Sequence, residues 1–320
     1  MTEALYLSGW RYRAVMFSVV GSAIGYLAFS LWGGWAAVSA AVGEVGLGGI
    51  LIALLMSSIN YLLRFGRWQI YLGAMGHKVP WRHSLRIYLA GFALTTTPGK
   101  AGEALRGVLL KSWGVPYPKS FAAFFSERLS DLFAVVLLTL FGLTLYPEAR
   151  AMIFIGVGLV LLGFFVLSQR RLLEWTAALL PLGAGKVASA LRHLLDVLIE
   201  AQRCHRLGIL IGVTCLSVVA WSAEALAFHW ILQWMGADVP LAFAVFVYAL
   251  AMLAGAISFM PGGLGGAEAV MVALLMWKGM AGADAVAATV LIRLATLWFA
   301  VAIGALMLLK YKSAAPVPQA

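Results

Sequence analysis

A short polar stretch, TTTPGKAGEALR, interrupts the apolar sequence between Thr95 and Arg106. Pro98 cannot donate a backbone hydrogen bond and Gly99 tolerates dihedral angles that end a helix, so a helix is expected to stop here. A second helix that begins at Lys100 would present free N–H groups and the positive end of its dipole. With the side chains of Lys100 and Arg106 close by, this helix start is suited to binding an anion such as phosphate.

A second break, FMPGGLGGAE, spans Phe259 to Glu268 and has glycines where the first break has its lysine. Gly262 and Gly263 would let a ligand approach the backbone closely, which predicts a cradle made of N–H groups alone. For both breaks the alternative is packing, because such residues also let helices cross closely. The charge of Lys100 favours binding at the first break, since packing does not require a charge.

Ionisable residues recur behind both breaks at one spacing. The interval from Glu103 to Arg128 equals the interval from Glu268 to Arg293. An ionised side chain at bilayer depth costs at least ~2.5–3.5 kcal/mol, so these residues suggest a function. The alternative is that each pair neutralises itself and holds the broken segment against a helix, which we favour for Glu268 and Arg293.

The first half has the richer set of charges. Arg128 and Asp131 are three residues apart, on one face of a helix. Three basic and three acidic side chains balance in this half: Lys100, Glu103, Arg106, Glu127, Arg128 and Asp131. A bound phosphate would compete for Arg106 or Arg128, or take Lys100, and this competition could act as a gate.

Four charged residues are secondary candidates for substrate binding. One is Glu127, and the other three are Arg64, Arg67 and Glu224. Arg64 and Arg67 end an apolar run, so they are expected either to anchor that helix at the cytoplasmic interface or to contact lipid headgroups. Glu224 is alone in an apolar run and is expected to face the protein interior.

The composition is that of a polytopic membrane protein. Of the 320 residues, 63% are hydrophobic and 11% are charged, whereas soluble domains have about 25% charged residues. A bilayer core takes about 20 helical residues to cross. The apolar runs predict an all-α fold with six transmembrane helices, at residues 14–37, 46–63, 119–146, 151–169, 207–235 and 284–309.

The basic residues indicate the orientation in the membrane and explain the net charge of +10 without a nucleic-acid partner. With the N-terminus inside, 17 of the 23 Lys and Arg residues fall on the cytoplasmic side, and only Arg150 and Lys278 fall opposite. This bias predicts that both termini lie in the cytoplasm. The two broken segments become re-entrant helical hairpins, and residues 170–206 an amphipathic cytoplasmic linker.

The sequence also contains an internal repeat. Tyr71 to Pro80 aligns with Ile231 to Pro240, and the Arg-Leu pair at Arg128 recurs at Arg293 at a similar offset. The two units start with helices that cross in opposite senses, so an inverted-topology repeat is predicted, which is typical of transporters. The single membrane domain, 1–320, would hold repeats at about 46–146 and 207–309.

The segments TTTPGKAGEALR, GVPYPKSFAAFFSERLSDL and PGGLGGAEAVMVALL resemble the lysylphosphatidylglycerol synthase transmembrane-region family, a flippase-like domain. The likeness extends from about Arg11 to Lys310. The family includes the membrane half of the bacterial multiple peptide resistance factor, which is taken to flip an aminoacylated phospholipid made by a fused synthase. Because this chain stops at Ala320, we expect a stand-alone member without the synthase domain, and the resemblance leaves its lipid open.

Together these features predict a flippase that moves a phosphate-bearing headgroup, of a phospholipid or a polyprenyl-phosphate-linked lipid, across the inner membrane. One alternative is a non-transporting, lipid-binding accessory subunit that partners a cytoplasmic lipid-modifying synthase. Another is a transporter of small anionic solutes. The sequence has no enzyme signature and its five histidines lack metal-ligand spacing, so no catalytic residue, cofactor or metal is expected.

Overall fold

The computed structural model describes residues 25–26, 34–96, 101–179, 186–258 and 260–312, and the regular secondary structure of these residues is helical. The expected helix at 14–37 lies mostly outside them, as do Gly99 and Lys100 at the first break.

The helices fall into two series. The first series comprises α2 (Trp35–Ala74), α3 (Trp81–Ala90), η1 (Gly91–Leu94), α4 (Ala101–Lys111), α5 (Tyr117–Leu143), η3 (Pro147–Ala149), α6 (Arg150–Ser168), α7 (Arg170–Ala178) and α8 (Lys186–Glu200). The second series comprises η4 (Ala201–His205), α9 (Leu207–Trp234), α10 (Leu241–Ile257), η5 (Pro261–Gly263), α11 (Gly266–Trp277), α12 (Gly282–Arg293), the π-helical turn η6 (Leu294–Trp298) and α13 (Phe299–Lys312).

Four helical stretches in the described residues are long and apolar enough to cross a membrane: α2, α6, α9 and the continuous stretch Gly282–Leu309. The chain is therefore a multi-pass α-helical membrane protein. A fifth helix, α5, has 27 residues but carries charged side chains in its middle, at Glu127, Arg128 and Asp131. That combination of length and buried charge makes α5 the element on which the site is built.

The prediction that the second apolar helix ends near residue 63 is wrong. α2 runs on to Ala74, with a kink at Gly46, where φ is +65°. The reason is that Arg67, which resembles an interfacial anchor in the sequence, is fully buried and ion-paired within the bundle. Its charge is neutralised by other helices and does not have to reach the membrane surface.

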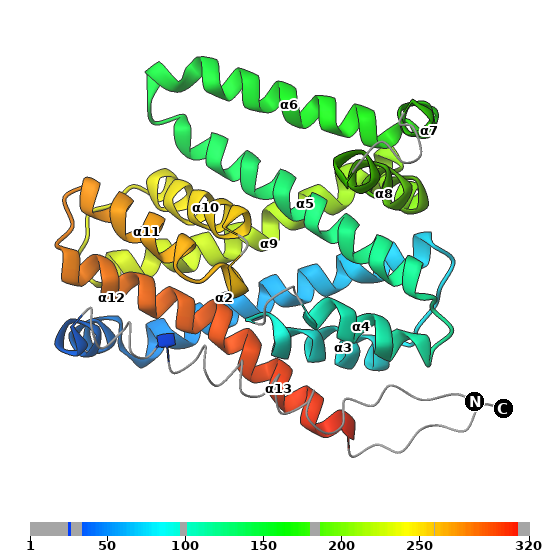
Figure 1. Ribbon diagram of the computed structural model, residues 1–320. Helices are drawn as coiled ribbons and strands as arrows, with labels where there is room; N and C mark the ends of the chain where they lie inside the picture. Colours follow the sequence, from blue (N-terminus) through cyan, green and yellow to red (C-terminus); the bar gives the residue numbers. More distant parts are fainter. Residues whose placement is uncertain (1–24, 27–33, 97–100, 180–185, 259, 313–320) are drawn as a thin grey trace.

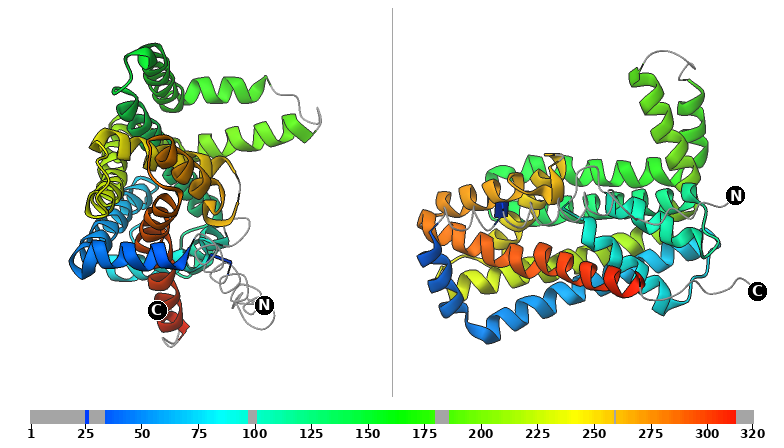
Figure 2. Two further views of the ribbon diagram at one scale, coloured as in Figure 1. Left: turned by 90° about the vertical axis from the view of Figure 1, so that its left-hand side faces the viewer. Right: turned by 60° about the horizontal axis from the view of Figure 1, so that its bottom comes forward.

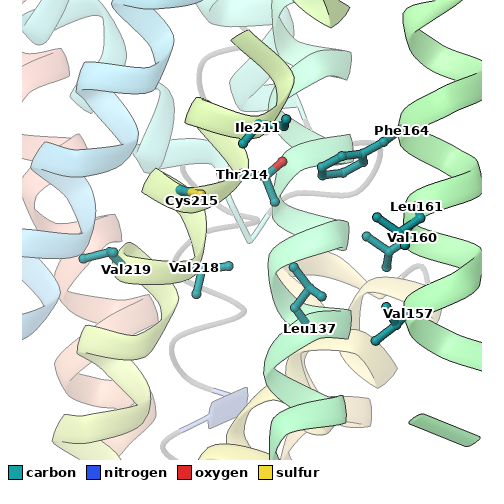
Figure 3. A pocket seen from close by; sticks show the side chains of 10 residues that line it. All are labelled: Leu137, Val157, Val160, Leu161, Phe164, Ile211, Thr214, Cys215, Val218 and Val219. Atoms are coloured by element: carbon teal, nitrogen blue, oxygen red, sulfur yellow. The ribbon is translucent and has the colours of Figure 1, made fainter. Parts of the chain in front are cut away.

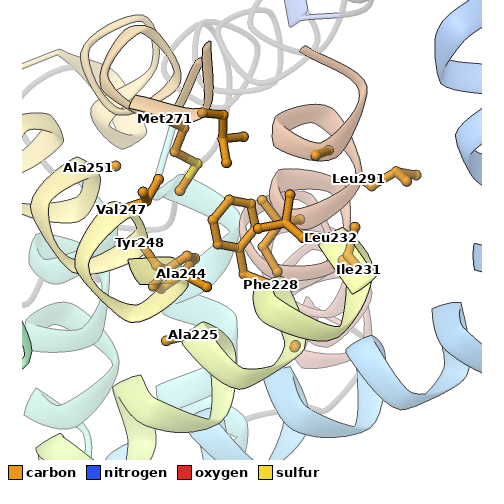
Figure 4. Packing of buried hydrophobic residues seen from close by; sticks show 14 of the residues in the cluster. Ala225, Phe228, Ile231, Leu232, Ala244, Val247, Tyr248, Ala251, Met271 and Leu291 are labelled. Carbon is orange, nitrogen blue, oxygen red and sulfur yellow. The ribbon is translucent and has the colours of Figure 1, made fainter. Parts of the chain in front are cut away.

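The two longest helices organise the bundle. α2 and α9 pack along each other and run in opposite directions, while α3 and α4 lie at the opposite end of the bundle from α10 and α11 (Figure 1). The main apolar core lies where α9, α10, α11 and α12 meet, around Phe228, Val247 and Met271 (Figure 4).

The predicted amphipathic linker is a pair of helices rather than one. α8 includes the expected periodic stretch, and α7 packs beside it, so that the two extend together from the bundle (Figure 2). Leu173 of α7 and Leu198 of α8 are buried in one apolar cluster that also includes Phe133 of α5. The linker is thereby attached to the helix that carries the site.

Corresponding elements of the two halves begin and end at matching positions. α2 and α9 end at Ala74 and Trp234, and the following helices begin at Trp81 and Leu241, so that both pairs of bounds have the same offset in sequence. The glycine after the first helix of each half, Gly76 or Gly236, has a positive φ of +83° or +76°. Each half then has a short helix, a break and a second short helix.

Candidate functional site

Six charged side chains from three helices form what we call the ionic cluster: Arg64 and Arg67 of α2, Arg106 of α4, and Glu127, Arg128 and Asp131 of α5. Two of its members, Arg67 and Glu127, have no exposed surface. Ionisable side chains inside a membrane protein are costly to bury and are therefore candidates for a functional site.

Asp131 is the acceptor at the centre of the ionic cluster. Its Oδ1 lies 2.6 Å from Nη1 of Arg67, and its Oδ2 lies 3.1 Å from Arg128 and 3.4 Å from Arg64. The indole Nε1 of Trp221, from α9, donates to Oδ1 at 3.0 Å. One carboxylate therefore holds three guanidinium groups and joins α2, α5 and α9.

Glu127 is the second acceptor. Its Oε2 lies 3.0 Å from Nη1 of Arg106, and its Oε1 lies 3.5 Å from Nη2 of Arg67. Arg67 also donates from Nη1 to the hydroxyl of Ser217 on α9. Glu127 thus links α4 to α2 and fixes the end of the first broken segment against α5.

Arg106 is held by aromatic rings as well as by Glu127. Its guanidinium carbon lies 4.2 Å from the ring centre of Tyr88, within the range of a cation–π interaction. The side chain passes directly over Gly91, where an added methyl group would lie 2.9 Å from its Cγ. Position 91 therefore requires a glycine, because a side chain there would collide with Arg106.

We expect Gly91→Ala to lower the free energy of unfolding by about 1–3 kcal/mol, because overpacking forces Arg106 to move. Thermal unfolding in detergent measures this loss. Gly73→Ala in α2 is the matched control, since its added methyl group meets nothing within 4 Å and alanine favours a helix. Equal melting temperatures for the two variants would contradict the packing of Arg106.

The ionic cluster carries more positive than negative charge. Four arginines face two carboxylates, which leaves two positive charges in excess. The six charged residues that balance in the sequence do not include Arg64 and Arg67, which add two positive charges. Lys100 and the Glu103 side chain lie outside the described residues. Their opposite charges cancel, so leaving them out does not change the excess. His205 of η4, 3.1 Å from Ser126 of α5, adds no charge at neutral pH, because burial lowers its pKa to about 4.

The excess charge lies toward the accessible side of the cluster. The side chain of Arg128 is 34% exposed, whereas those of Arg67 and Glu127 are almost fully buried. Arg64 lies between these extremes and stacks over Trp221 at 5.3 Å. An anion entering from outside the cluster would meet Arg128 and Arg64 first.

The second break has a self-contained charge pair, as favoured from the sequence. Nε of Arg293 lies 2.6 Å from Oε1 of Glu268, and Nη2 of Arg293 donates to the carbonyl of Gly262 at 2.8 Å. The other oxygen of Glu268 accepts the N–H of Gly265 at 2.6 Å. The N-terminus of α11 is therefore capped by its own acid.

The glycines of the second break serve close packing. A methyl group on Gly263 would lie 3.1 Å from the backbone of Gly255 in α10, and one on Gly262 would lie 3.3 Å from Cγ2 of Thr96. Thr96 directly precedes the undescribed residues of the first break. The described start of the first break therefore lies against Gly262 of the second break.

Glu224 lies between the two charged regions. It is buried in α9, and its Oε2 accepts a hydrogen bond of 2.6 Å from the hydroxyl of Tyr248. Arg64 and Arg293 are both within electrostatic reach of it. The expectation that Glu224 faces the protein interior is confirmed.

The structure brings six of the residues predicted from sequence together in the ionic cluster, and places Gly262, Gly263, Glu268 and Arg293 at the second break. Arg128 pairs with Asp131, as their spacing indicated; its predicted pairing with Glu103 is untested. Trp221, Ser217 and Tyr88 were not predicted, because an aromatic or serine in an apolar helix has no pattern that marks a polar contact. Among the described residues, no group of three or more His, Cys, Asp or Glu side chains forms a metal site.

The helices and the ionic cluster define a polytopic membrane protein with charged side chains packed between its helices. The chain belongs to the family described as lysylphosphatidylglycerol synthase TM region, whose model matches residues 15–304.

Curated relatives agree with this assignment. A UPF0104 membrane protein of Methanothermobacter thermautotrophicus is 26% identical, over 80% of this chain and 83% of its own length. A UPF0104 membrane protein of Pyrococcus horikoshii is also 26% identical, over 82% of this chain and 86% of its own length.

Proposed function

We propose that the protein is a lipid flippase, which moves a phosphate-bearing headgroup between the leaflets of a bacterial inner membrane. The observation that carries the proposal is the excess of two positive charges in the ionic cluster, inside an apolar bundle. Unpaired charge in such surroundings is costly, and a bound phosphate would offset that cost. The proposed activity involves no covalent step and no cofactor.

The proposed headgroup site is the accessible side of the ionic cluster. Arg64 and Arg128 share Asp131 with Arg67, so each has N–H groups available beyond its ion pair. Guanidinium groups bind phosphate oxygens through paired hydrogen bonds, which a monovalent phosphate diester or a divalent monoester can both accept. Lys100, predicted from the sequence to bind phosphate, is a further candidate, and the charge of Glu103 would balance its own.

We also propose that the chain forms an inverted-topology repeat with two re-entrant hairpins, an arrangement that would suit this function. Its evidence is the matching offset of the helix bounds, the opposite directions of α2 and α9, and the hydrogen bond of 2.8 Å from Asn60 to the carbonyl of Ala220, its repeat partner. A contact between equivalent positions is expected where helices pack across a two-fold axis. In this proposal the first break would open the site to one leaflet and the second break would open it to the other.

The proposed orientation keeps both termini in the cytoplasm. Arg64 and Arg67 no longer count toward the charge bias, because they pair within the bundle. Fifteen basic residues still fall on the proposed cytoplasmic side against two on the other, which retains the positive-inside pattern.

The test is translocation in proteoliposomes that contain a fluorescent phospholipid, with a membrane-impermeant quencher reporting the exposed leaflet. Fluorescent phosphatidylglycerol and a labelled polyprenyl phosphate should both be tried, with radiolabelled inorganic phosphate as the small-anion arm. We expect headgroup translocation by the wild-type protein. Lipid binding without translocation would indicate an accessory subunit, phosphate uptake a solute transporter, and either result would overturn the flippase.

Arg128→Gln is the sharpest variant, because Asp131 retains Arg64 and Arg67 as partners. Loss of one charge-assisted hydrogen bond costs about 1.5–3 kcal/mol, which predicts translocation about tenfold to a hundredfold slower. Arg170→Gln is the control, since Arg170 forms only an exposed pair with Glu174 among the described residues. If both variants transport equally well, the site assignment is wrong.

A further inference from the structure

An apolar groove of about 420 Å³ lies between α5, α6 and α9 (Figure 3). Leu137 of α5, Val160 and Phe164 of α6, and Val218 of α9 contribute to its walls. α6 presents large apolar side chains outward along its length, among them Phe154 and Leu161. In a bilayer such a surface faces lipid, so lipid chains are the molecules available to enter the groove.

The groove adjoins the ionic cluster through α9. Ser217, which accepts a hydrogen bond from Arg67, directly precedes Val218 of the groove wall. On α5, Leu137 lies less than two helical turns beyond Asp131, which is about 9 Å along the helix axis. One molecule could therefore contact the arginines with its polar end and the groove with its apolar part.

A polar side chain in the groove lacks a partner among the described residues. The hydroxyl of Thr214 is buried, lines the groove and makes no hydrogen bond within the described part of the chain (Figure 3). Other buried hydroxyl groups in these helices, such as those of Ser126 in α5 and Ser217 in α9, donate to the carbonyl four residues earlier. A buried hydroxyl without a partner is costly, and an acceptor oxygen of a molecule in the groove would satisfy it.

We propose that this groove binds one aliphatic chain of a membrane lipid, with the hydroxyl of Thr214 donating to an ester or ether oxygen at the polar end of that chain. The inference rests on the proposed function, because the same lipid would place its phosphate at Arg64 and Arg128. The chain would hold the lipid in register while the headgroup enters the cluster. Association of apolar surfaces in a membrane depends on packing and hydrogen bonds, which a shaped groove and Thr214 supply.

Cys215 provides a reporter in the native protein. It is exposed and lines the groove, whereas Cys204 is buried without exposed surface. The experiment measures the rate of maleimide labelling of purified, detergent-solubilised protein, with Cys215→Ser giving the background. We expect phosphatidylglycerol to slow the labelling several-fold, and glycerol phosphate, which has no chain, to leave it unchanged.

Thr214→Val tests the hydrogen bond separately. We expect it to weaken protection of Cys215 by phosphatidylglycerol about two- to tenfold, the effect of one neutral hydrogen bond. It should leave the melting temperature equal or higher, because it removes an unpaired buried hydroxyl. Comparing ester- with ether-linked phosphatidylglycerol identifies the oxygen: equal protection means an ether oxygen suffices, and loss with the ether lipid means a carbonyl is required.

Val218→Trp, which fills the groove, should remove the protection by lipid, and Leu62→Trp on the exposed face of α2 is its control. Labelling that no lipid slows, while translocation persists, would overturn the groove and leave the proposed function intact. Protection by lipid without translocation would support lipid binding in the groove and contradict the proposed flippase function. Protection that follows protein concentration rather than lipid would show that a second copy covers the groove, against the proposal.

Discussion

Replacing Asp131 by asparagine is expected to cost about 3–5 kcal/mol of stability, because one partner of a buried ion pair is removed while the other stays buried. Asp131 accepts from Arg64, Arg67 and Arg128 at 2.6–3.4 Å. Without its charge, the four arginines of the ionic cluster keep only Glu127 as an ion-paired acid within that cluster. The excess rises from two positive charges to three, in a site that water screens poorly.

The measurement is thermal unfolding of the purified variant in detergent, followed by intrinsic tryptophan fluorescence or by size-exclusion after heating. Glu174→Gln is the matched control, since it removes an acid from an exposed pair with Arg170 and should change stability by less than about 1 kcal/mol. An Asp131→Asn variant as stable as this control would show that Asp131 does not neutralise the arginines.

A second variant keeps this prediction testable if Asp131→Asn fails to accumulate. Adding Arg128→Gln restores the excess to two positive charges, so the double variant should recover part of the lost stability. Phosphatidylglycerol should raise the melting temperature of Asp131→Asn more than that of the wild type, because the additional positive charge has a partner only in the anion. No recovery in either experiment would contradict the charge balance.

The parts of the site that could be predicted are those encoded by local spacing. Arg128 and Asp131 lie three apart on one helix, and the structure joins them at 3.1 Å. The spacing shared by the two halves indicated Glu268 and Arg293, which form a pair at 2.6 Å. The helices α5, α6 and α9 follow the apolar runs closely, because a bilayer imposes helix on every long apolar segment.

The unpredicted parts depend on contacts between distant segments. Arg67 ends an apolar run in the sequence, which is typical of an interfacial residue, yet α5 supplies Asp131 and Glu127 for it. Once these acids pair with Arg67, α2 can continue through the bundle. The same tertiary contact changes the charge balance from neutral to positive, so the strongest evidence for an anion site appears only when the helices are packed.

Gly91 shows a second limit of sequence reasoning. A glycine in an apolar helix indicates close approach, but not what approaches. Here it is the side chain of Arg106, which crosses from α4 to reach Glu127 and Tyr88. Its acidic partner, Glu127, lies on the next helix of the chain. Because several acids lie near Arg106 in the sequence, spacing alone does not show which of them pairs with it.

Arg293→Met is expected to be the most damaging change in the second half of the protein. It leaves Glu268 buried with one hydrogen bond, from the N–H of Gly265, and it frees the carbonyl of Gly262. Breaking a buried pair in this way costs about 3–5 kcal/mol. We expect Glu268→Leu to lower the melting temperature by about as much as Arg293→Met does, because it leaves the guanidinium of Arg293 unpaired.

The double variant Glu268→Leu/Arg293→Met separates a structural role from a functional one. Replacing both partners of a buried pair by apolar residues is often neutral or stabilising, although here the loop also loses the hydrogen bonds at Gly262 and Gly265. We therefore expect partial recovery of stability relative to either single variant. Because this pair carries no excess charge, lipid translocation by the double variant should remain within about threefold of wild type. Recovered folding with translocation as slow as in Arg128→Gln would show instead that Arg293 contacts the headgroup during transport.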